Sequence, residues 1–159
     1  MCIRDSINLA RMTKGPLLEA ELDWDLLAAT VHAAVRFLDN VIDMNQFPLP
    51  EIGEMTRGNR KIGLGVMGFA DLLFKLGLPY DSEQSVEIAE RLASFVRKTA
   101  WDSSVRLAQA RHPLPALDGS LWDTDRGGRP VRNASVTTIA PTGTISISAG
   151  CSKSPSATG

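Results

Sequence analysis

The segment from Arg132 to Ser146 decides the fold and reads Arg-Asn-Ala-Ser-Val-Thr-Thr-Ile-Ala-Pro-Thr-Gly-Thr-Ile-Ser. Its β-branched run, Val136 to Ile139, predicts a buried strand. Pro141 ends the strand ladder, because proline has no backbone N–H to donate. The strand therefore leads directly into a turn of small hydroxyl residues.

This turn has the composition of an anion site. Gly143 lets the backbone approach a ligand and accommodates a positive φ. Thr142, Thr144 and Ser146 offer hydroxyl donors beside free backbone N–H groups, and such a nest suits a phosphate or a carboxylate. On residue types alone, the alternative interpretation is a strand followed by an ordinary polar turn. A P-loop is excluded because the stretch lacks Gly-Lys-Ser/Thr.

The chain upstream of this segment is mainly helical. Apolar residues recur at three- and four-residue steps, and Asp23 or Asp25 can begin the first long helix. Pro and Gly mark the ends of the helices. We expect a strand at 6–10, helices over 23–44, 50–59, 66–76 and 82–111, and a loop over 113–131. Strands separated by helical crossovers predict an α/β architecture.

Composition narrows the function classes. The chain has 159 residues, with 17 Lys plus Arg against 18 Asp plus Glu, a balance that argues against a nucleic-acid or membrane-surface binder. Cys2 and Cys151 lack the spacing of a metal site or a disulfide scaffold, so a reducing cytoplasm is the expected compartment. No apolar run approaches the roughly 20 residues of a membrane span.

Three further motifs have competing interpretations. Gly63 to Gly68 matches the G-x-G-x-x-G string of dinucleotide-binding proteins, but the preceding residues are too polar for the required buried strand, so close packing of a helix against a neighbouring backbone is favoured. Asp39 and Asp43 lie one helical turn apart, and a solvated or helix-capping role is favoured over metal binding. Neither His32 nor His112 has a Ser or Cys partner that the sequence identifies.

Several segments together resemble one family. They look like the ribonucleotide reductase large-subunit barrel, most of all its adenosylcobalamin-dependent class. The matching segments, in chain order, are Ser6–Ala10, Arg36–Asp43, Asn59–Asp71, Arg132–Ser146 and Ala149–Ser152. The resemblance covers residues 6–152, which we expect to be part of the catalytic barrel domain of a longer protein. We expect residues 1–5 and 153–159 to be non-native or disordered.

The resemblance implies an α/β fold, a piece of a ten-stranded barrel that is mostly helical here. It assigns binding of the substrate phosphates to Pro141, Thr142, Gly143, Thr144, Ile145 and Ser146. The implied activity is reduction of ribonucleotides to deoxyribonucleotides by cobalamin-initiated thiyl radical chemistry, with adenosylcobalamin as cofactor and no metal held by these residues. The implied partners are the ribonucleotide and a thiol reductant such as a thioredoxin-like protein. A homodimer of the parent protein is also compatible with the resemblance.

Departures from the family pattern define what this chain lacks. The family's Asn-x-Cys-x-Glu loop, with the radical cysteine, lies upstream, so the chain alone is expected to be inactive. Cys2 falls at the spacing of a reducing cysteine, although Ile3-Arg4-Asp5 do not match the family. Two alternatives stay open: the large subunit of a diiron-dependent reductase, and a non-enzymatic nucleotide-binding module built on the glycine string.

Overall fold

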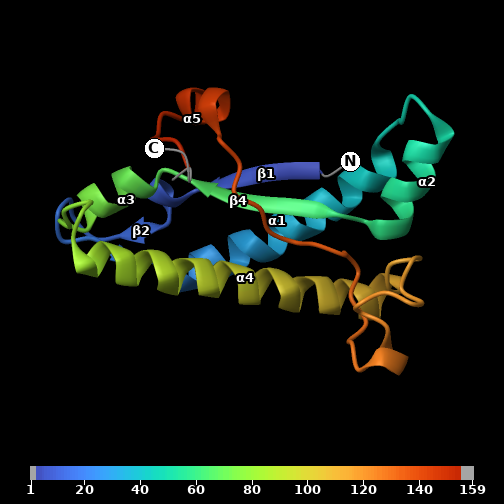
Figure 1. Ribbon diagram of the computed structural model, residues 1–159. Coiled ribbons are helices and arrows are strands. Elements are labelled where there is room, and N and C mark those ends of the chain that lie inside the picture. Colours follow the sequence, from blue (N-terminus) through green and yellow to red (C-terminus); the bar gives the residue numbers. More distant parts are fainter. Residues whose placement is uncertain (1–2, 155–159) are drawn as a thin grey trace.

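The computed structural model describes residues 3–154, which form a mostly helical chain around a few parallel strands (Figure 1). Cys2 lies outside the described residues. In chain order the elements are β1 (Ile3–Asn8), the 3-10 turn η1 (Leu9–Arg11), β2 (Thr13–Lys14), β3 (Glu21–Leu22), α1 (Trp24–Met44), α2 (Pro50–Asn59), β4 (Ile62–Met67), α3 (Phe69–Lys75), α4 (Glu83–Arg111), the 3-10 turn η2 (Thr124–Arg126) and α5 (Gly143–Ala149).

β1 and β4 are the centre of a small parallel sheet. They pair in register from Ile3 with Ile62 to Asn8 with Met67. Segment 135–138 runs along the other edge of β4, where Leu64 N donates to Val136 O at 2.8 Å and Thr138 N donates to Leu64 O at 3.1 Å. The sequence predicted a buried strand over 136–139. The segment does run beside β4, but it pairs through a single bridge, forms no regular strand and leaves Ile139 73% exposed, so the predicted strand is wrong in extent and in burial. Within the described residues these parallel segments do not close a barrel.

The two long helices agree with the sequence prediction. α1 begins after Asp23, whose carboxylate accepts a hydrogen bond from Leu26 N at 2.9 Å. α4 begins after Ser82, whose hydroxyl accepts from Ser85 N at 3.3 Å. Both side chains satisfy N–H groups that have no partner inside the helix. Predicted and observed bounds agree within a residue.

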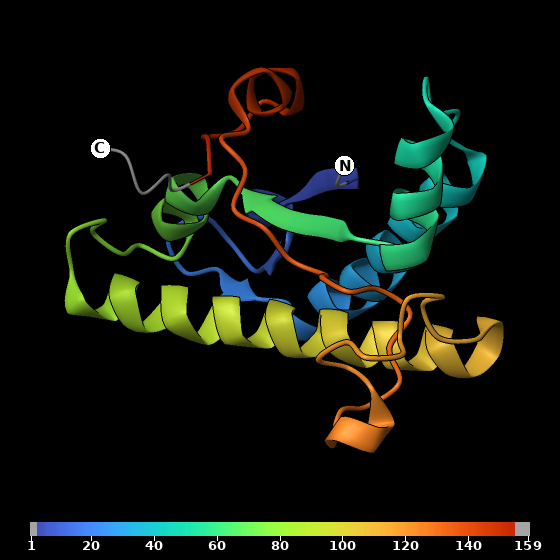
Figure 2. The ribbon, with the colours of Figure 1, turned by 45° about the vertical axis from the view of Figure 1, so that its right-hand side comes forward.

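The core lies between α1, α4 and the sheet. α1 packs against α4 on one side and against β1 and β4 on the other. Figures 1 and 2 show α4 on one side of the sheet and α5 on the other. Trp24 fixes the start of α1 to α4, because its ring meets Phe95 edge-on at 4.9 Å and carries the Arg91 guanidinium at 4.9 Å. The buried contacts include Leu27, Val31, Val35, Leu38, Ile42, Ile62, Leu64, Leu92, Val96 and Ala100.

The predicted helix over 66–76 is wrong in its first turn. Residues 62–67 form β4, and α3 begins only at Phe69. Gly65 explains the difference, because a Cβ there would lie 3.0 Å from Thr138 O and 3.1 Å from Ser6 Oγ. Close packing is thus the role of this glycine, as expected, but it occurs in the middle of a strand rather than on a helix.

An apolar groove of about 640 Å³ separates α4 from β4 and residues 137–139. Val86 on the α4 wall is 57% exposed and Ile139 on the opposite wall 73% exposed. Contiguous apolar surface of this kind promotes association between molecules.

We predict that the 159-residue chain self-associates and that Val86→Glu weakens the association, because a charge in the groove must be desolvated when a second molecule covers it. Sedimentation velocity over a concentration series measures the effect. Leu121→Glu is the matched control, since Leu121 is 88% exposed but lies in the 113–131 loop. Equal effects of both changes would show that the groove is not the contact.

Candidate functional site

The turn at 141–146 lies beyond the carboxyl ends of the parallel strands. β1 ends at Asn8 and β4 at Met67, and these residues are register partners. Segment 135–138 runs parallel to β4, so the residues that follow it emerge at the same edge. Figure 1 shows α5 over this edge. Ligands of open parallel α/β sheets bind at the carboxyl edge, where the strands release their loops.

Thr142 has the unusual conformation in this turn. Its φ of 52° and ψ of 21° are left-handed, and it is the N-cap of α5. The sequence allowed a positive φ at Gly143, and that expectation is wrong, because Thr142 takes it instead. For a residue with a Cβ this conformation costs about 1–3 kcal/mol and persists where surrounding contacts impose it. One such contact is the hydrogen bond from Ser154 N to Thr142 Oγ1 at 2.7 Å.

Three backbone donors are open at the start of α5. Within residues 3–154, the N–H groups of Gly143, Thr144 and Ile145 have no acceptor, whereas Ser146 N donates to Thr142 O at 2.9 Å. A Cβ added to Gly143 would meet no atom within 4 Å, so space over the donors is open in the same range. The turn can therefore hold an anion with backbone groups.

The hydroxyl groups of the turn have different surroundings. Ser146 is 1% exposed and its hydroxyl donates to Gly143 O at 3.0 Å. Thr142 is 8% exposed and its oxygen accepts from Ser154 N. Thr144 is exposed and can reach a ligand. The sequence treated these three hydroxyls as equivalent, and the structure leaves Thr144 as the accessible one.

The glycine string does not form a dinucleotide site. Gly63 and Gly65 are buried inside β4, where their backbone groups face neighbouring strands. Gly68 has φ 74° and joins β4 to α3, and a Cβ on it would lie 2.7 Å from Asn8 Oδ1. Buried glycines inside a strand cannot cover a pyrophosphate, so the interpretation based on this string is not supported.

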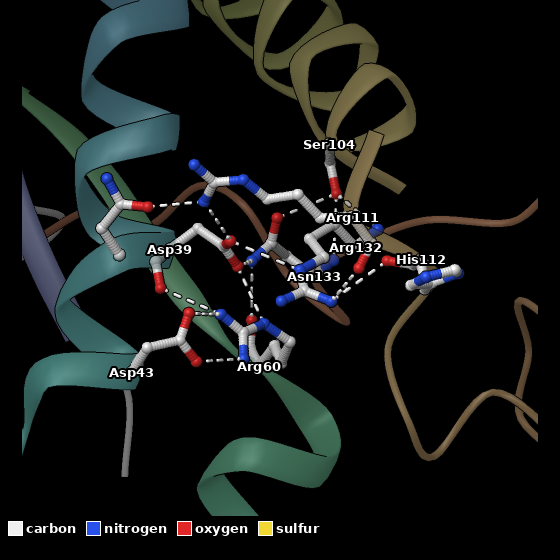
Figure 3. Close-up of polar contacts among 9 residues, drawn as sticks. Asp39, Asp43, Arg60, Ser104, Arg111, His112, Arg132 and Asn133 are labelled. Carbon is white, nitrogen blue, oxygen red and sulfur yellow. Dashed lines mark hydrogen bonds and ion pairs between the residues drawn. The ribbon is translucent and has the colours of Figure 1, made fainter. Parts of the chain in front are cut away.

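A second polar assembly, an ion cluster centred on Asp39, lies at the amino end of β4 (Figure 3). Asp39 has 0% exposure. Its Oδ1 accepts from Arg60 Nε at 2.9 Å and Asn133 Nδ2 at 3.0 Å. Its Oδ2 accepts from Arg132 Nε at 3.3 Å and lies 3.6 Å from Arg111 Nη1. The expected solvated or capping role of Asp39 is therefore wrong.

Asp43 forms the outer part of this ion cluster. Arg60 donates to both of its carboxylate oxygens, at 2.8 and 2.9 Å. These hydrogen bonds lower the pKa of Asp43, although partial burial opposes the shift. Burial lowers the pKa of Arg60, but hydrogen bonds to Asp43 and Asp39 outweigh burial, and the net pKa is raised. Arg60 is held charged between the two acids.

Ser104 and Asn133 attach the cluster to the end of α4. Ser104 Oγ donates to Asn133 Oδ1 at 3.0 Å and accepts from the Asn133 and Arg132 N–H groups at 3.0 and 3.1 Å. Arg132 Nη1 donates to the carbonyl oxygens of Arg111 and His112 at 2.9 and 3.1 Å. Donors surround both Asp39 oxygens, so the cluster has a structural role rather than a ligand site.

His32 has a serine partner that the sequence did not identify. Its Nδ1 lies in hydrogen-bond contact with Ser103 Oγ, which joins α1 to α4. Burial lowers the pKa of His32, and Arg106 adds to this effect while Asp102 opposes it. The pair lies between two helices, away from the carboxyl edge of the sheet, so it fastens the helices together.

Cys151 is the cysteine within the described range, close to the end of β4. Burial raises the pKa of its thiol, Asp71 raises it further, and Arg11 opposes them. The protonated thiol is the unreactive form.

Among residues 3–154, no three His, Cys, Asp or Glu side chains gather closely enough for a metal ion. Across the same residues, none of the helices combines the length and apolarity that crossing a membrane requires.

Comparison with known proteins identifies the family. Residues 1–158 match the family described as ribonucleotide reductase, barrel domain, so the chain belongs to this family. It is 52% identical over 149 residues to the vitamin B12-dependent ribonucleoside-diphosphate reductase of Mycobacterium tuberculosis. The aligned region covers 94% of the chain and 20% of that relative. The similarly named protein of Thermoplasma acidophilum is 49% identical over 153 residues, covering 96% of the chain and 19% of that relative.

More distant relatives match a shorter part of the chain. The ribonucleoside-diphosphate reductase subunit alpha of Chlamydia trachomatis is 40% identical over 131 residues, covering 82% of the chain and 12% of that relative. The chain thus spans about a fifth of the length of the B12-dependent relatives. The α/β class and the reductase family predicted from the sequence are confirmed at this level.

We predict that Asp39→Ala lowers the free energy of unfolding by about 3–5 kcal/mol, because it removes one of the two carboxylates beside the buried Arg60 and leaves Arg132 and Asn133 without the acceptor that they share. Urea unfolding of the dilute chain, followed by circular dichroism, measures the change. Asp25→Ala is the matched control, since Asp25 is an exposed acid on the same helix. A loss below about 1 kcal/mol for Asp39→Ala would contradict the structural role.

A pH dependence follows from the Asp43–Arg60 pair. The folded-state pKa of Asp43 is lowered from its ordinary 3.8, so the pair contributes stability above that pH and loses it as pH falls further. The difference in unfolding free energy between the unchanged chain and Asp43→Asn should therefore be largest near neutral pH and shrink as the pH falls below 3.8. Urea midpoints over a descending pH series test this. If the difference in unfolding free energy stays constant with pH, it arises from packing rather than from the ion pair.

Proposed function

We propose that residues 141–146 bind the phosphates of a ribonucleotide within a ribonucleoside-diphosphate reductase, which converts ribonucleotides to deoxyribonucleotides. The supporting observation is the set of three open N–H groups, on Gly143, Thr144 and Ile145, at the carboxyl edge of the sheet. Membership of the reductase barrel family supports the same assignment. Residues 6–152 would then be part of the catalytic barrel, with the remaining residues as its flanks.

Phosphate chemistry fits these donors. Phosphate oxygens accept several hydrogen bonds at once, and each bond from a neutral N–H to a charged oxygen contributes roughly 1.5–3 kcal/mol. The first turn of α5 contains no acidic residue that would repel the ligand. The exposed hydroxyl of Thr144 adds one further donor.

The proposed cofactor is adenosylcobalamin, because the two relatives near 50% identity are named vitamin B12-dependent. Within residues 3–154, the side chains at the carboxyl edge offer no histidine to a corrinoid: His32 contacts Ser103 between helices, and His112 follows α4 beside the ion cluster. Residues 3–154 therefore offer the cofactor no histidine ligand at this edge. Their proposed contribution is phosphate anchoring and barrel wall.

The remaining partners are proposed with the activity. A thiol reductant of the thioredoxin-like type would restore a reducing cysteine pair, in which Cys2 is the one candidate that this chain contributes. A homodimer in the cytoplasm is the proposed state of the parent protein. The alternative, a reductase large subunit with a diiron radical source, would use the same phosphate turn. The higher identity to the B12-dependent relatives favours the first assignment.

We predict that Gly143→Val raises KM for a ribonucleoside diphosphate at least about tenfold, through the loss of one or two hydrogen bonds to phosphate. The test uses a chimeric reductase in which this chain replaces the matching 149 residues of the Mycobacterium tuberculosis relative. A Cβ at Gly143 meets no protein atom, so a rise in KM reports exclusion of the ligand rather than damage to the turn.

Gly58→Val is the matched control for this experiment. Like Gly143, Gly58 lies in a helix and does not have a positive φ, and a Cβ on it makes only an ordinary contact, 3.9 Å from Ala116 Cβ, but the residue lies in α2. Ser146→Ala should have a smaller effect than Gly143→Val, since the backbone donors remain. A near-normal KM for Gly143→Val in an active chimera would refute the assignment of the phosphate site.

A further inference from the structure

We propose that Asp71, in the first turn of α3, is a positioning residue for the phosphate turn and acts through residues 151–154. This inference rests on the proposed function of residues 141–146. Asp71 lies 70 to 75 positions before the turn in the sequence, but the chain folds back after α5 and brings α3 close to the turn. We call residues 151–154 the return segment.

The return segment is attached to α3 by reciprocal hydrogen bonds. Ser152 N donates to Asp71 Oδ2 at 2.5 Å, and Asp71 N donates to Ser152 Oγ at 3.4 Å. Gly68 N donates to Ser152 O at 2.8 Å. The N-cap of α3 is Gly68, which has no side chain that could accept a hydrogen bond from Ser152 N. The Asp71 carboxylate accepts that hydrogen bond and so fixes the Ser152 backbone.

The return segment is attached to the phosphate turn at two points. Cys151 N donates to Ser146 O at 3.0 Å. Cys151 directly precedes Ser152, the residue whose N–H is bound by Asp71. Ser154 N donates to Thr142 Oγ1 at 2.7 Å, and both residues are buried. Ser152 and Ser154 are two residues apart, a span of at most about 7 Å. A displacement of Ser152 is therefore transmitted to Thr142 with little slack.

Thr142 determines where the phosphate donors point. Its left-handed backbone precedes Gly143, whose N–H is the first open donor of the turn. Most residues avoid this conformation, so Thr142 stays in it only while its side chain and backbone are held. If Asp71 releases the return segment, Thr142 can relax to negative φ and turn the donors away from the phosphate.

The charge of Asp71 supports an indirect role. A carboxylate near a phosphate repels it, so the acid does not serve as a ligand for the substrate. Its role as an acceptor for Ser152 N needs only an oxygen, and an asparagine amide supplies one. Asp71→Asn should therefore preserve the positioning, whereas Asp71→Ala should remove it.

The test measures KM and kcat in the chimeric reductase defined above. We expect Asp71→Ala to raise KM for a ribonucleoside diphosphate about tenfold with kcat within about twofold, and Asp71→Asn to keep KM within about twofold. Asp81→Ala is the matched control, since Asp81 is an exposed acid just before α4. A purely structural role would instead lower kcat through a smaller active fraction, with KM unchanged, and that result would overturn the proposal.

A second pair of variants covers the case in which Asp71→Ala fails to fold. Thr142→Val removes the acceptor for Ser154 N and should raise KM as Asp71→Ala does, while Thr142→Ser keeps the acceptor and should not. In the double variant the two effects should not add, because both act through one chain of hydrogen bonds. Full additivity, or a normal KM for Thr142→Val, would overturn the proposal.

The two levels of inference separate in the same assay. If Gly143→Val leaves KM normal in the active chimera, the proposed phosphate site itself fails. If Gly143→Val raises KM while Asp71→Ala does not, the phosphate site stands and only the positioning role of Asp71 fails.

Discussion

The buried carboxylate of Asp39 is the constraint on which the rest of the structure depends. A charge with 0% exposure must be compensated inside the protein, and four side chains from distant parts of the chain converge to do so. They join α1, the start of β4, the end of α4 and the segment that leads to residues 135–138. Because Asn133 is fixed at the cluster, the extended residues after it are placed in register beside β4. The turn at 141–146 is then delivered to the carboxyl edge of the sheet.

The two ends of the sheet thus have opposite physical characters. At the amino end the polar groups satisfy one another, because each carboxylate oxygen of Asp39 accepts a hydrogen bond from side chains of the described residues. At the carboxyl end the polar groups of the turn face open space, with three backbone donors lacking acceptors among the described residues. Buried ion pairs add less net stability than apolar packing, but removal of one partner is costly. The apolar core supplies the stability, and the ion cluster selects one arrangement of the segments.

Local patterns in the sequence were sufficient for the long helices. The apolar periodicity of α1 and α4, together with Asp23 and Ser82 as caps, depends on neighbours within a turn or two. The failures depend on residues far apart in the chain. Asp39 meets partners 21 and 94 positions away, and periodicity cannot show which cations will meet a given acid. The glycine string likewise becomes strand β4 because Ser6 and Thr138 approach Gly65 from both sides. Composition and resemblance selected the turn that is proposed to bind phosphate, but the burial that separates Thr144 from Thr142 and Ser146 comes from tertiary packing.

A phosphate site built from backbone N–H groups has a consequence for the family. Every residue except proline carries a backbone N–H, so such a site depends more on backbone conformation than on residue identity. The residues that matter most are then those that hold the turn in its conformation. In the proposed function, phosphate binding would not depend on how the parent protein generates a radical. The proposal agrees with a match that extends from the B12-dependent relatives at 49–52% identity to an alpha subunit at 40% identity over a shorter stretch. On this view the residues that fix Thr142, Asp71 among them, belong to the substrate site as much as the donors do, because a backbone donor binds a phosphate only in the direction in which the fold points it.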